Sequence, residues 1–170
     1  LMAIAQQLSA MPVRLIGVPI GQASLPFFAK NSSAKERTEL STMVNHTILE
    51  MLYLALPLSA MVLVLRIPLV RLAYGADSFP WGETVLTGKL VAILALSIAA
   101  RSLTHVLVRV FYALHNTTVP LVANLLSTII NVSVSYYFLF VAQAGILGMA
   151  FAITVASILE TMVLTAILYG

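Results

Sequence analysis

The chain has 170 residues, of which 61% are hydrophobic and only 9% are charged, and its formal net charge is +3. The mean hydropathy of +1.02 is far above that of an ordinary soluble domain, so the composition excludes that class. Cysteine is absent and no run of Lys and Arg occurs, which excludes disulfides, thiolate metal sites and a nucleic-acid partner.

The apolar stretches are continuous rather than alternating, and several reach the roughly 20 residues that a helix needs to cross a bilayer. The sequence therefore predicts an all-α, polytopic membrane bundle in a single domain, residues 1–170, with about five transmembrane helices and no cofactor. Position 1 is Leu1 rather than Met, and both ends of the chain are hydrophobic. We therefore expect a piece of a longer chain, and we expect the further transmembrane helices of that chain to be partners of this piece.

The first expected span, residues 2–28, is apolar but carries polar side chains. Prolines free backbone groups and predict a bent or broken helix here; they stand at Pro12, Pro19 and Pro26. Gly17 and Gly21 have the spacing that allows two helices to approach closely, which favours a packing role. Arg14 and Gln7, with Gln6 and Gln22 nearby, lie either on a cavity or at a membrane interface.

The next part of the chain alternates between polar segments and a second span. Residues 30–39 are charged and predict either a short interfacial helix or a solvated loop. The second span, residues 43–65, is followed by Arg66 and Arg71 at the level of the lipid headgroups. Turn-forming residues between Tyr74 and Glu83, with Trp81 among them, then predict an aqueous loop.

Three further spans complete the chain: residues 84–114, 120–141 and 144–168. The first of these is longer than a bilayer requires, so we expect it to tilt or to project beyond the hydrocarbon. The distribution of Lys and Arg over the loops favours the Lys30 loop as the cytoplasmic one.

A basic stripe lies in the third span, because Arg101, His105 and Arg109 follow one another at four-residue intervals. A cation buried in a bilayer costs roughly 2.5 to 3.5 kcal/mol, so such residues usually face a cavity, a counter-charge or a ligand. We expect this role for Arg101 at mid-span, an interface anchor for Arg109, and a hydrogen-bonded helix contact rather than a proton relay for His105. The stripe indicates an anionic cargo.

Two carboxylates, Glu50 and Glu160, stand in otherwise apolar spans, where each needs a partner, a proton or water. Both are candidates for coupling transport to an ion, and an ion pair with Arg101 or Arg14 is an equal alternative. Two rows of polar residues repeat at helical spacing and are interpreted as helix-packing seams: Asn124, Thr128, Asn131 and Ser135, and Thr154, Ser157, Thr161 and Thr165.

No catalytic or metal-binding pattern is found in the sequence. His46, His105 and His115 lack the spacing of metal ligands, and no phosphate-binding glycine loop follows a strand. An enzyme is therefore not expected.

One segment resembles a known family. Residues 108–120, with the sequence VRVFYALHNTTVP, are similar to the R-x-F-Y-A-x-x-D-T-x-T-P segment of the MurJ/MviN lipid II flippases. Upstream, Pro12, residues 17–21, and the pair Leu25 and Pro26 resemble the P-x-G-x-x-G-V…L-P helix of the same family, at a fitting distance. The resemblance extends over nearly the whole chain.

The resemblance implies a piece of the second half of a transporter of the multidrug/oligosaccharidyl-lipid/polysaccharide exporter superfamily. Such a transporter flips lipid-linked peptidoglycan precursor (lipid II) across the bacterial inner (plasma) membrane by alternating access, with cavity arginines facing the diphosphate. The implied phosphate-facing cations are Arg14 and Arg101, with Gln7 as a polar cavity group. The chain departs from the pattern where Gln7 replaces a common cavity arginine and Asn116 replaces an Asp, which keeps another polyprenyl-linked glycan open as the substrate.

Two other functions stay open at the level of sequence. A drug or organic-cation exporter of the same superfamily would depend on Glu50 and Glu160 more than on the arginines. A non-transporting membrane scaffold would use its polar rows only to pack partner helices, and Arg14 and Arg101 would then be dispensable.

Overall fold

The computed structural model describes residues 1–30, 37–74 and 80–169, and within these ranges the chain is helical with no strand. The all-α class expected from the composition is confirmed. The helices and two π-helical segments are α1 (Met2–Pro12), η1 (Val13–Gly17), α2 (Val18–Lys30), α3 (Arg37–Val64), α4 (Arg66–Tyr74), α5 (Trp81–Ala95), α6 (Ile98–Ala113), α7 (Thr118–Tyr136), η2 (Tyr137–Val141) and α8 (Gly145–Tyr169). The predicted interfacial helix or loop at residues 30–39 falls largely on 31–36, which lie outside the described residues.

Three described helices are long and apolar enough to cross a membrane: Ser41–Val64, Thr118–Val141 and Gly145–Tyr169. The pair α5 and α6 makes a fourth if the two bent helices count as one span. The helices α1 and α2, with 11 and 13 residues, are each shorter than the about 20 residues of a single span.

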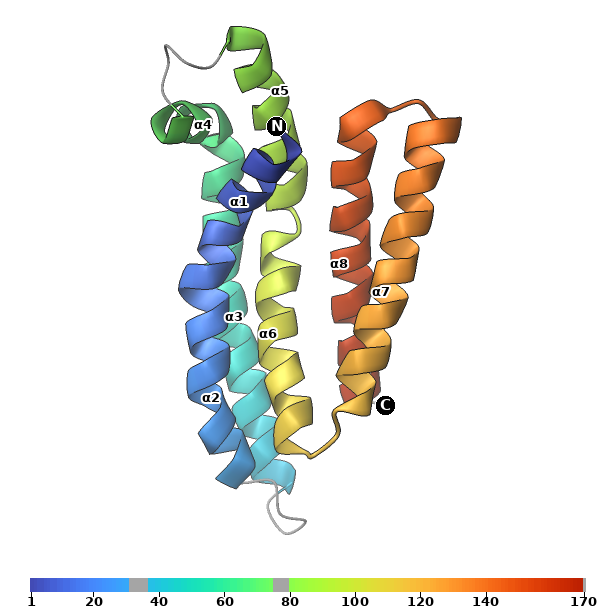
Figure 1. The fold of residues 1–170 in the computed structure, drawn as a ribbon. Coiled ribbons are helices and arrows are strands. Elements are labelled where there is room, and N and C mark those ends of the chain that lie inside the picture. The colour runs from blue at the N-terminus through green and yellow to red at the C-terminus, as the bar shows by residue number, and fades with distance from the viewer. Residues whose placement is uncertain (31–36, 75–79, 170) are drawn as a thin grey trace.

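The helices form two groups that lie side by side (Figure 1). One group contains α1, α2, α3, α5 and α6, and the other is the hairpin of α7 and α8, in which α8 faces the first group. The end of α2, the start of α3 and the α6–α7 turn lie at one end of the bundle, whereas α4 and the α7–α8 turn lie at the other.

The predicted break in the first span takes the form of a π turn. In η1 the backbone N–H of Val18 bonds to the carbonyl of Val13, one residue further back than in an α-helix. Pro12 precedes this turn, and a proline cannot donate the usual backbone hydrogen bond. The chain stays helical through the turn, and α1 leans away from the direction of α2 (Figure 1).

The third expected span differs from the single long helix that was predicted. It breaks after Ala95, and α5 and α6 meet at an angle of 43°. The carbonyls at the break accept hydroxyl groups: Ser97 Oγ bonds to Leu94 O at 2.7 Å, and Ser59 Oγ of α3 bonds to Ala95 O at 2.6 Å. Because these hydroxyls replace the missing helical partners, the break is stable without a proline.

The π turn and α2 pack very closely against α6, at the two glycines expected to serve packing. A Cβ on Gly17 would lie 3.1 Å from the Cα of Ser102, and one on Gly21 would lie 3.1 Å from the carbonyl oxygen of His105. The packing role is confirmed, and the close approach holds Arg14 of η1 and the basic stripe of α6 on neighbouring helices.

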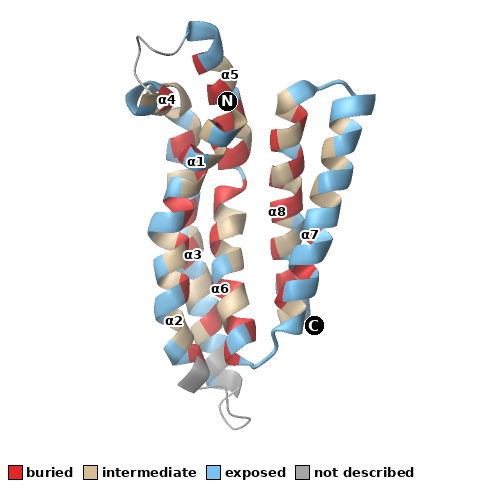
Figure 2. Ribbon diagram, viewed as in Figure 1, coloured by how far each residue is buried: buried red, intermediate tan, exposed pale blue. Residues whose placement is uncertain are grey.

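Buried apolar residues lie where the helices of each group meet, while much of the outer surface stays apolar and exposed (Figure 2). On α7, for example, Leu125 is 55% exposed and Ile129 is 62% exposed. Such a surface suits a bundle that is surrounded by lipid or by further helices rather than by water.

Candidate functional site: a polar cleft between four helices

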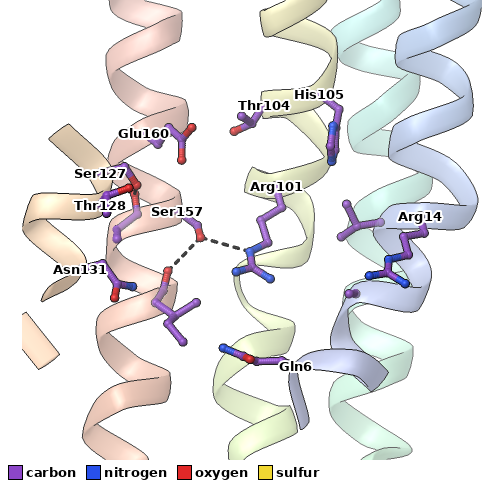
Figure 3. Close-up of a pocket in the computed structure, with 14 residues that line it drawn as sticks. Gln6, Arg14, Arg101, Thr104, His105, Ser127, Thr128, Asn131, Ser157 and Glu160 are labelled. Carbon is purple, nitrogen blue, oxygen red and sulfur yellow. Dashed lines mark hydrogen bonds between the residues drawn. The ribbon is translucent and has the colours of Figure 1, made fainter. Parts of the chain in front are cut away.

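A cleft of about 570 Å³ opens between the two groups of helices, and it is lined by α1 with its continuation η1 and by α6, α7 and α8. We call it the polar cleft. Its polar side chains, labelled in Figure 3, are Gln6, Arg14, Arg101, Thr104, His105, Ser127, Thr128, Asn131, Ser157 and Glu160. Because these residues come from four distant parts of the chain, the site exists only in the folded bundle.

Arg101 extends from α6 into the polar cleft. Its Nε donates a hydrogen bond to Ser157 Oγ of α8 at 3.2 Å, and Ser157 in turn donates to the carbonyl of Ile153 at 2.8 Å. This bond fixes one edge of the guanidinium, while its two terminal nitrogens make no hydrogen bond within the described chain. A planar fork held in this way suits the oxygens of a phosphate or carboxylate.

Arg14 lies on η1 and reaches the same cleft from the side of α1 (Figure 3). A second, shallower hollow joins Arg14 and Arg101 to Gln6 and Gln7. The structure thus brings Arg14 and Arg101, the two cations expected to face a phosphate, to one region with Gln7, the expected polar cavity group. Arg14 and Gln7 are exposed there, whereas Arg101 is half-buried.

Glu160 of α8 lines the polar cleft and also an adjoining cavity of about 600 Å³. That cavity contains Arg109 and His105, so Glu160 faces the whole basic stripe of α6 from the opposite helix. Glu160 forms no ion pair with Arg101 or Arg14 within the described ranges, so the ion-pair alternative is not what the structure contains. The Glu160 carboxylate therefore offsets positive charge in the polar cleft without forming an ion pair across it among the described residues.

His105 is placed differently from the expectation. The side chain of His105 is exposed in the cleft and makes no hydrogen bond to any described residue, so the predicted hydrogen-bonded helix contact is wrong. Instead its backbone provides the contact, against Gly21. Arg109 is half-buried, and its Cζ lies 5.9 Å from the centre of the Tyr112 ring in the adjoining cavity.

Glu50 is not part of the polar cleft. It lies exposed on α3, in an apolar groove with Ile20, Leu49, Tyr53 and Leu54. The sequence treated Glu50 and Glu160 as equivalent, and the structure separates them, because α3 turns this face away from α7 and α8. Of these two carboxylates, Glu160 is the one that lines the polar cleft with Arg101.

The two polar rows have different roles. The row on α8 is a helix-packing seam, as predicted: Thr161 Oγ1 bonds to the Ala100 carbonyl at 2.9 Å, and Thr154 Oγ1 bonds to the Ile93 carbonyl at 3.0 Å. The row on α7 is not a seam, because Thr128 and Asn131 line the polar cleft and Asn124 lines the adjoining cavity. The cleft residues of α7 were therefore missed, although their spacing was visible in the sequence.

The family of the chain follows from comparison with known proteins. A family model described as lipid II flippase MurJ matches residues 1–169. The chain belongs to this family. The resemblance seen in the sequence is thereby confirmed, and the apolar helices are those of a membrane protein.

Relatives and a solved structure agree with this family. Probable lipid II flippases MurJ from Bdellovibrio bacteriovorus and Rhizobium tropici are 26% and 28% identical, over 96% and 97% of this chain and 31% of each relative. A solved lipid II flippase MurJ in an inward closed conformation matches with a TM-score of 0.83 at 21% identity, over 98% of this chain and 34% of that one. The MurJ fold is thus shared, and the chain spans about a third of the length of these relatives.

Proposed function

We propose that the full-length protein flips the lipid-linked peptidoglycan precursor, lipid II, across the bacterial inner membrane by alternating access. The observation that carries this proposal is the polar cleft, which two guanidinium groups from separate helices, Arg14 of η1 and Arg101 of α6, both line. The relatives that are similar over nearly the whole chain are named as probable lipid II flippases, which supports the same substrate.

The chemistry of the cleft suits a diphosphate. Moving a diphosphate from water into a bilayer is very costly unless positive charge compensates it. Arg101 and Arg14 provide that charge, and Arg101 is already oriented by Ser157. On the opposite side of the polar cleft, α7 contributes the hydroxyl and amide groups of Ser127, Thr128 and Asn131, which suit the sugar part of a head group. Transport, rather than catalysis, is the role we infer.

The substrate within the class of lipid-linked glycans depends on one departure from the family pattern. Gln7 occupies the place of a common cavity arginine, so one cation is missing from the second hollow beside the polar cleft. Arg14 lines the same hollow as Gln7 and supplies a guanidinium there. Lipid II is the proposed substrate, and another polyprenyl-linked glycan is the alternative that Gln7 would favour.

The membrane arrangement is part of the proposal. The chain crosses the inner membrane several times, with the broken helix α1–α2 completing the five expected spans. The Lys30 and His115 connections face the cytoplasm, in agreement with the positive charge near them. The remaining transmembrane helices of the full-length chain close the open side of the cleft, and membrane lipids surround the rest.

Removing the charge of Arg101 tests this function. In full-length protein reconstituted into vesicles, Arg101→Ala should reduce the flipping of fluorescent lipid II at least tenfold, because a charge-assisted hydrogen bond contributes about 1.5 to 3 kcal/mol. Lys89→Ala is the matched control, since Lys89 is an exposed cation of α5 outside the cleft, and it should flip lipid II normally. Normal flipping by the Arg101 variant would contradict the proposal.

Rescue of cells depleted of their own lipid II flippase then separates the substrates. Growth supported by the full-length gene indicates lipid II, and failure at normal expression indicates another lipid-linked glycan. An organic-cation exporter would instead lose activity with Glu160→Gln and keep it with Arg101→Ala. The placement of Glu50 outside the cleft leaves that alternative with one carboxylate rather than two.

A further inference from the structure

The short helix α4 lies at the surface end of a candidate membrane span. The span Ser41–Val64 ends two residues before α4 begins at Arg66. In Figure 1, α4 lies across the end of α3, whereas α3 and α5 run along the bundle. The α7–α8 turn lies at the same end, shortly after the exposed side chains of Tyr136 and Tyr137. Trp and Tyr concentrate at the level of the lipid headgroups, and Trp81 at the start of α5 is also exposed, so we place α4 at that level.

One face of α4 is fixed on the protein, and the other is free. Val70 is completely buried, and the Cδ1 atom of Ile67 reaches so close to Gly88 of α5 that a Cβ there would lie 2.6 Å away. On the outer face, Leu72 is 88% exposed and Arg71 is also exposed. A helix that is held in place with an apolar and a basic residue pointing outward has the pattern of an interfacial anchor.

The guanidinium of Arg71 is held in place without being neutralised. Its Cζ lies 4.5 Å from the centre of the Trp81 ring, which is a cation–π contact. Within the described residues no carboxylate pairs with Arg71, and the nearby Glu83, in the first turn of α5, is exposed and unpaired with it. Arg66 differs, because its Nη1 donates to the carbonyl of Leu63 at 3.3 Å. The hydrogen-bond donors of Arg71 are therefore available to a ligand.

We propose that Arg71, Leu72 and Trp81 form a binding site for an anionic glycerophospholipid. Arg71 binds the headgroup phosphate, Leu72 inserts among the acyl chains, and the Trp81 ring lies at the boundary between them. The charges are complementary, because α4 carries two arginines and no acidic residue. This lipid site does not depend on the proposed transport function, since it lies at the end of the bundle and shares no residue with the polar cleft.

Local quenching by brominated lipids tests the site. A bimane label is placed at Leu72→Cys in the full-length protein, after any cysteine outside these 170 residues has been replaced, and the protein is reconstituted with brominated phosphatidylglycerol or brominated phosphatidylcholine. Both lipids should quench the label, and phosphatidylglycerol should be about fivefold more effective, which corresponds to about 1 kcal/mol for one basic side chain near the membrane surface. High salt should reduce this preference.

Two arginine variants on the same helix provide the comparison. In Arg71→Gln, the ratio of quenching by phosphatidylglycerol to quenching by phosphatidylcholine should fall close to one. In Arg66→Gln the ratio should stay near five, because Arg66 is engaged with a backbone carbonyl. Equal quenching by the two lipids in the protein with Arg71, or an unchanged preference in Arg71→Gln, would overturn the assignment. The absence of quenching by either lipid would also overturn it, since α4 would then be covered by protein or lie in water.

Discussion

The polar rows on α7 and α8 have nearly the same spacing in the sequence and opposite positions in the structure. On α8, Thr154 and Thr161 are buried and bond to carbonyls of α5 and α6. On α7, Asn124 and Thr128 are exposed, and Thr128 and Asn131 face the polar cleft. The difference lies in the neighbour, because α8 packs against the larger group of helices, whereas α7 packs mainly against α8. Spacing shows that polar residues share a face, and only packing decides what that face meets.

Stability should depend on the α8 row, and within the comparison of the two rows this is the largest effect that we expect. Thr161→Val removes the hydroxyl that bonds to Ala100 O and to Thr104 Oγ1 while keeping the side-chain volume. We expect a loss of about 1 kcal/mol in the free energy of unfolding of the full-length protein, about a fivefold change in the folding equilibrium. Thermal unfolding in detergent measures it.

Thr165→Val is the matched control for that experiment. Among the described residues, the Thr165 hydroxyl bonds only to the carbonyl of Thr161 in its own helix, at 2.7 Å. Its removal should change stability by a few tenths of a kcal/mol. Equal destabilisation by the two variants would show that the contact between α6 and α8 is not the stabilising one.

Transport should depend on the α7 row, with little effect on stability. Asn131→Ala removes an amide that lines the polar cleft and has no hydrogen-bond partner in the described chain. We expect flipping of lipid II to fall about threefold, because a neutral hydrogen bond contributes about 0.5 to 1.5 kcal/mol, while the unfolding temperature stays unchanged. Ser133→Ala, at an exposed position of α7 outside the cleft, is the control. A lower unfolding temperature without loss of flipping would reverse the roles assigned to the two rows.

The smallest effect is expected at the carboxylate outside the cleft. Glu50→Gln should leave flipping unchanged, because Glu50 lies in a separate groove on α3. Glu160→Gln should alter it, since Glu160 lines both the polar cleft and the adjoining cavity. The measurement is the rate of flipping by the two variants side by side. An equal loss of flipping in Glu50→Gln and Glu160→Gln would mean that the two carboxylates have equivalent roles, as the sequence suggested.

The sequence could predict what depends on local chemistry. The all-α class followed from continuous apolar stretches, the disrupted first helix followed from its prolines, and a close helix contact at Gly17 and Gly21 followed from their spacing, although its partner α6 did not. Arg101 could be singled out because a cation at mid-span is costly wherever the helix lies.

What could not be predicted depends on long-range partners. The break between α5 and α6 contains no proline or glycine, and its carbonyls are satisfied by Ser59 and by Ser97. The side-chain partner of Arg101, Ser157, stands 56 positions away in the sequence. Glu50 and Glu160 have similar apolar neighbours along the chain, and only the direction of α3 tells them apart.

The hydroxyl groups of α8 determine how the broken helix can move. Thr154 of α8 bonds to α5 on one side of the break, and Thr161 of α8 bonds to α6 on the other side. The helix α8 therefore bridges the break between α5 and α6. Any change in the 43° angle must therefore exchange at least one of these hydroxyl partners or shift α8 along with it. Because α8 also carries Ser157 and Glu160, straightening or bending this joint would move the anchor of Arg101 and its counter-charge together.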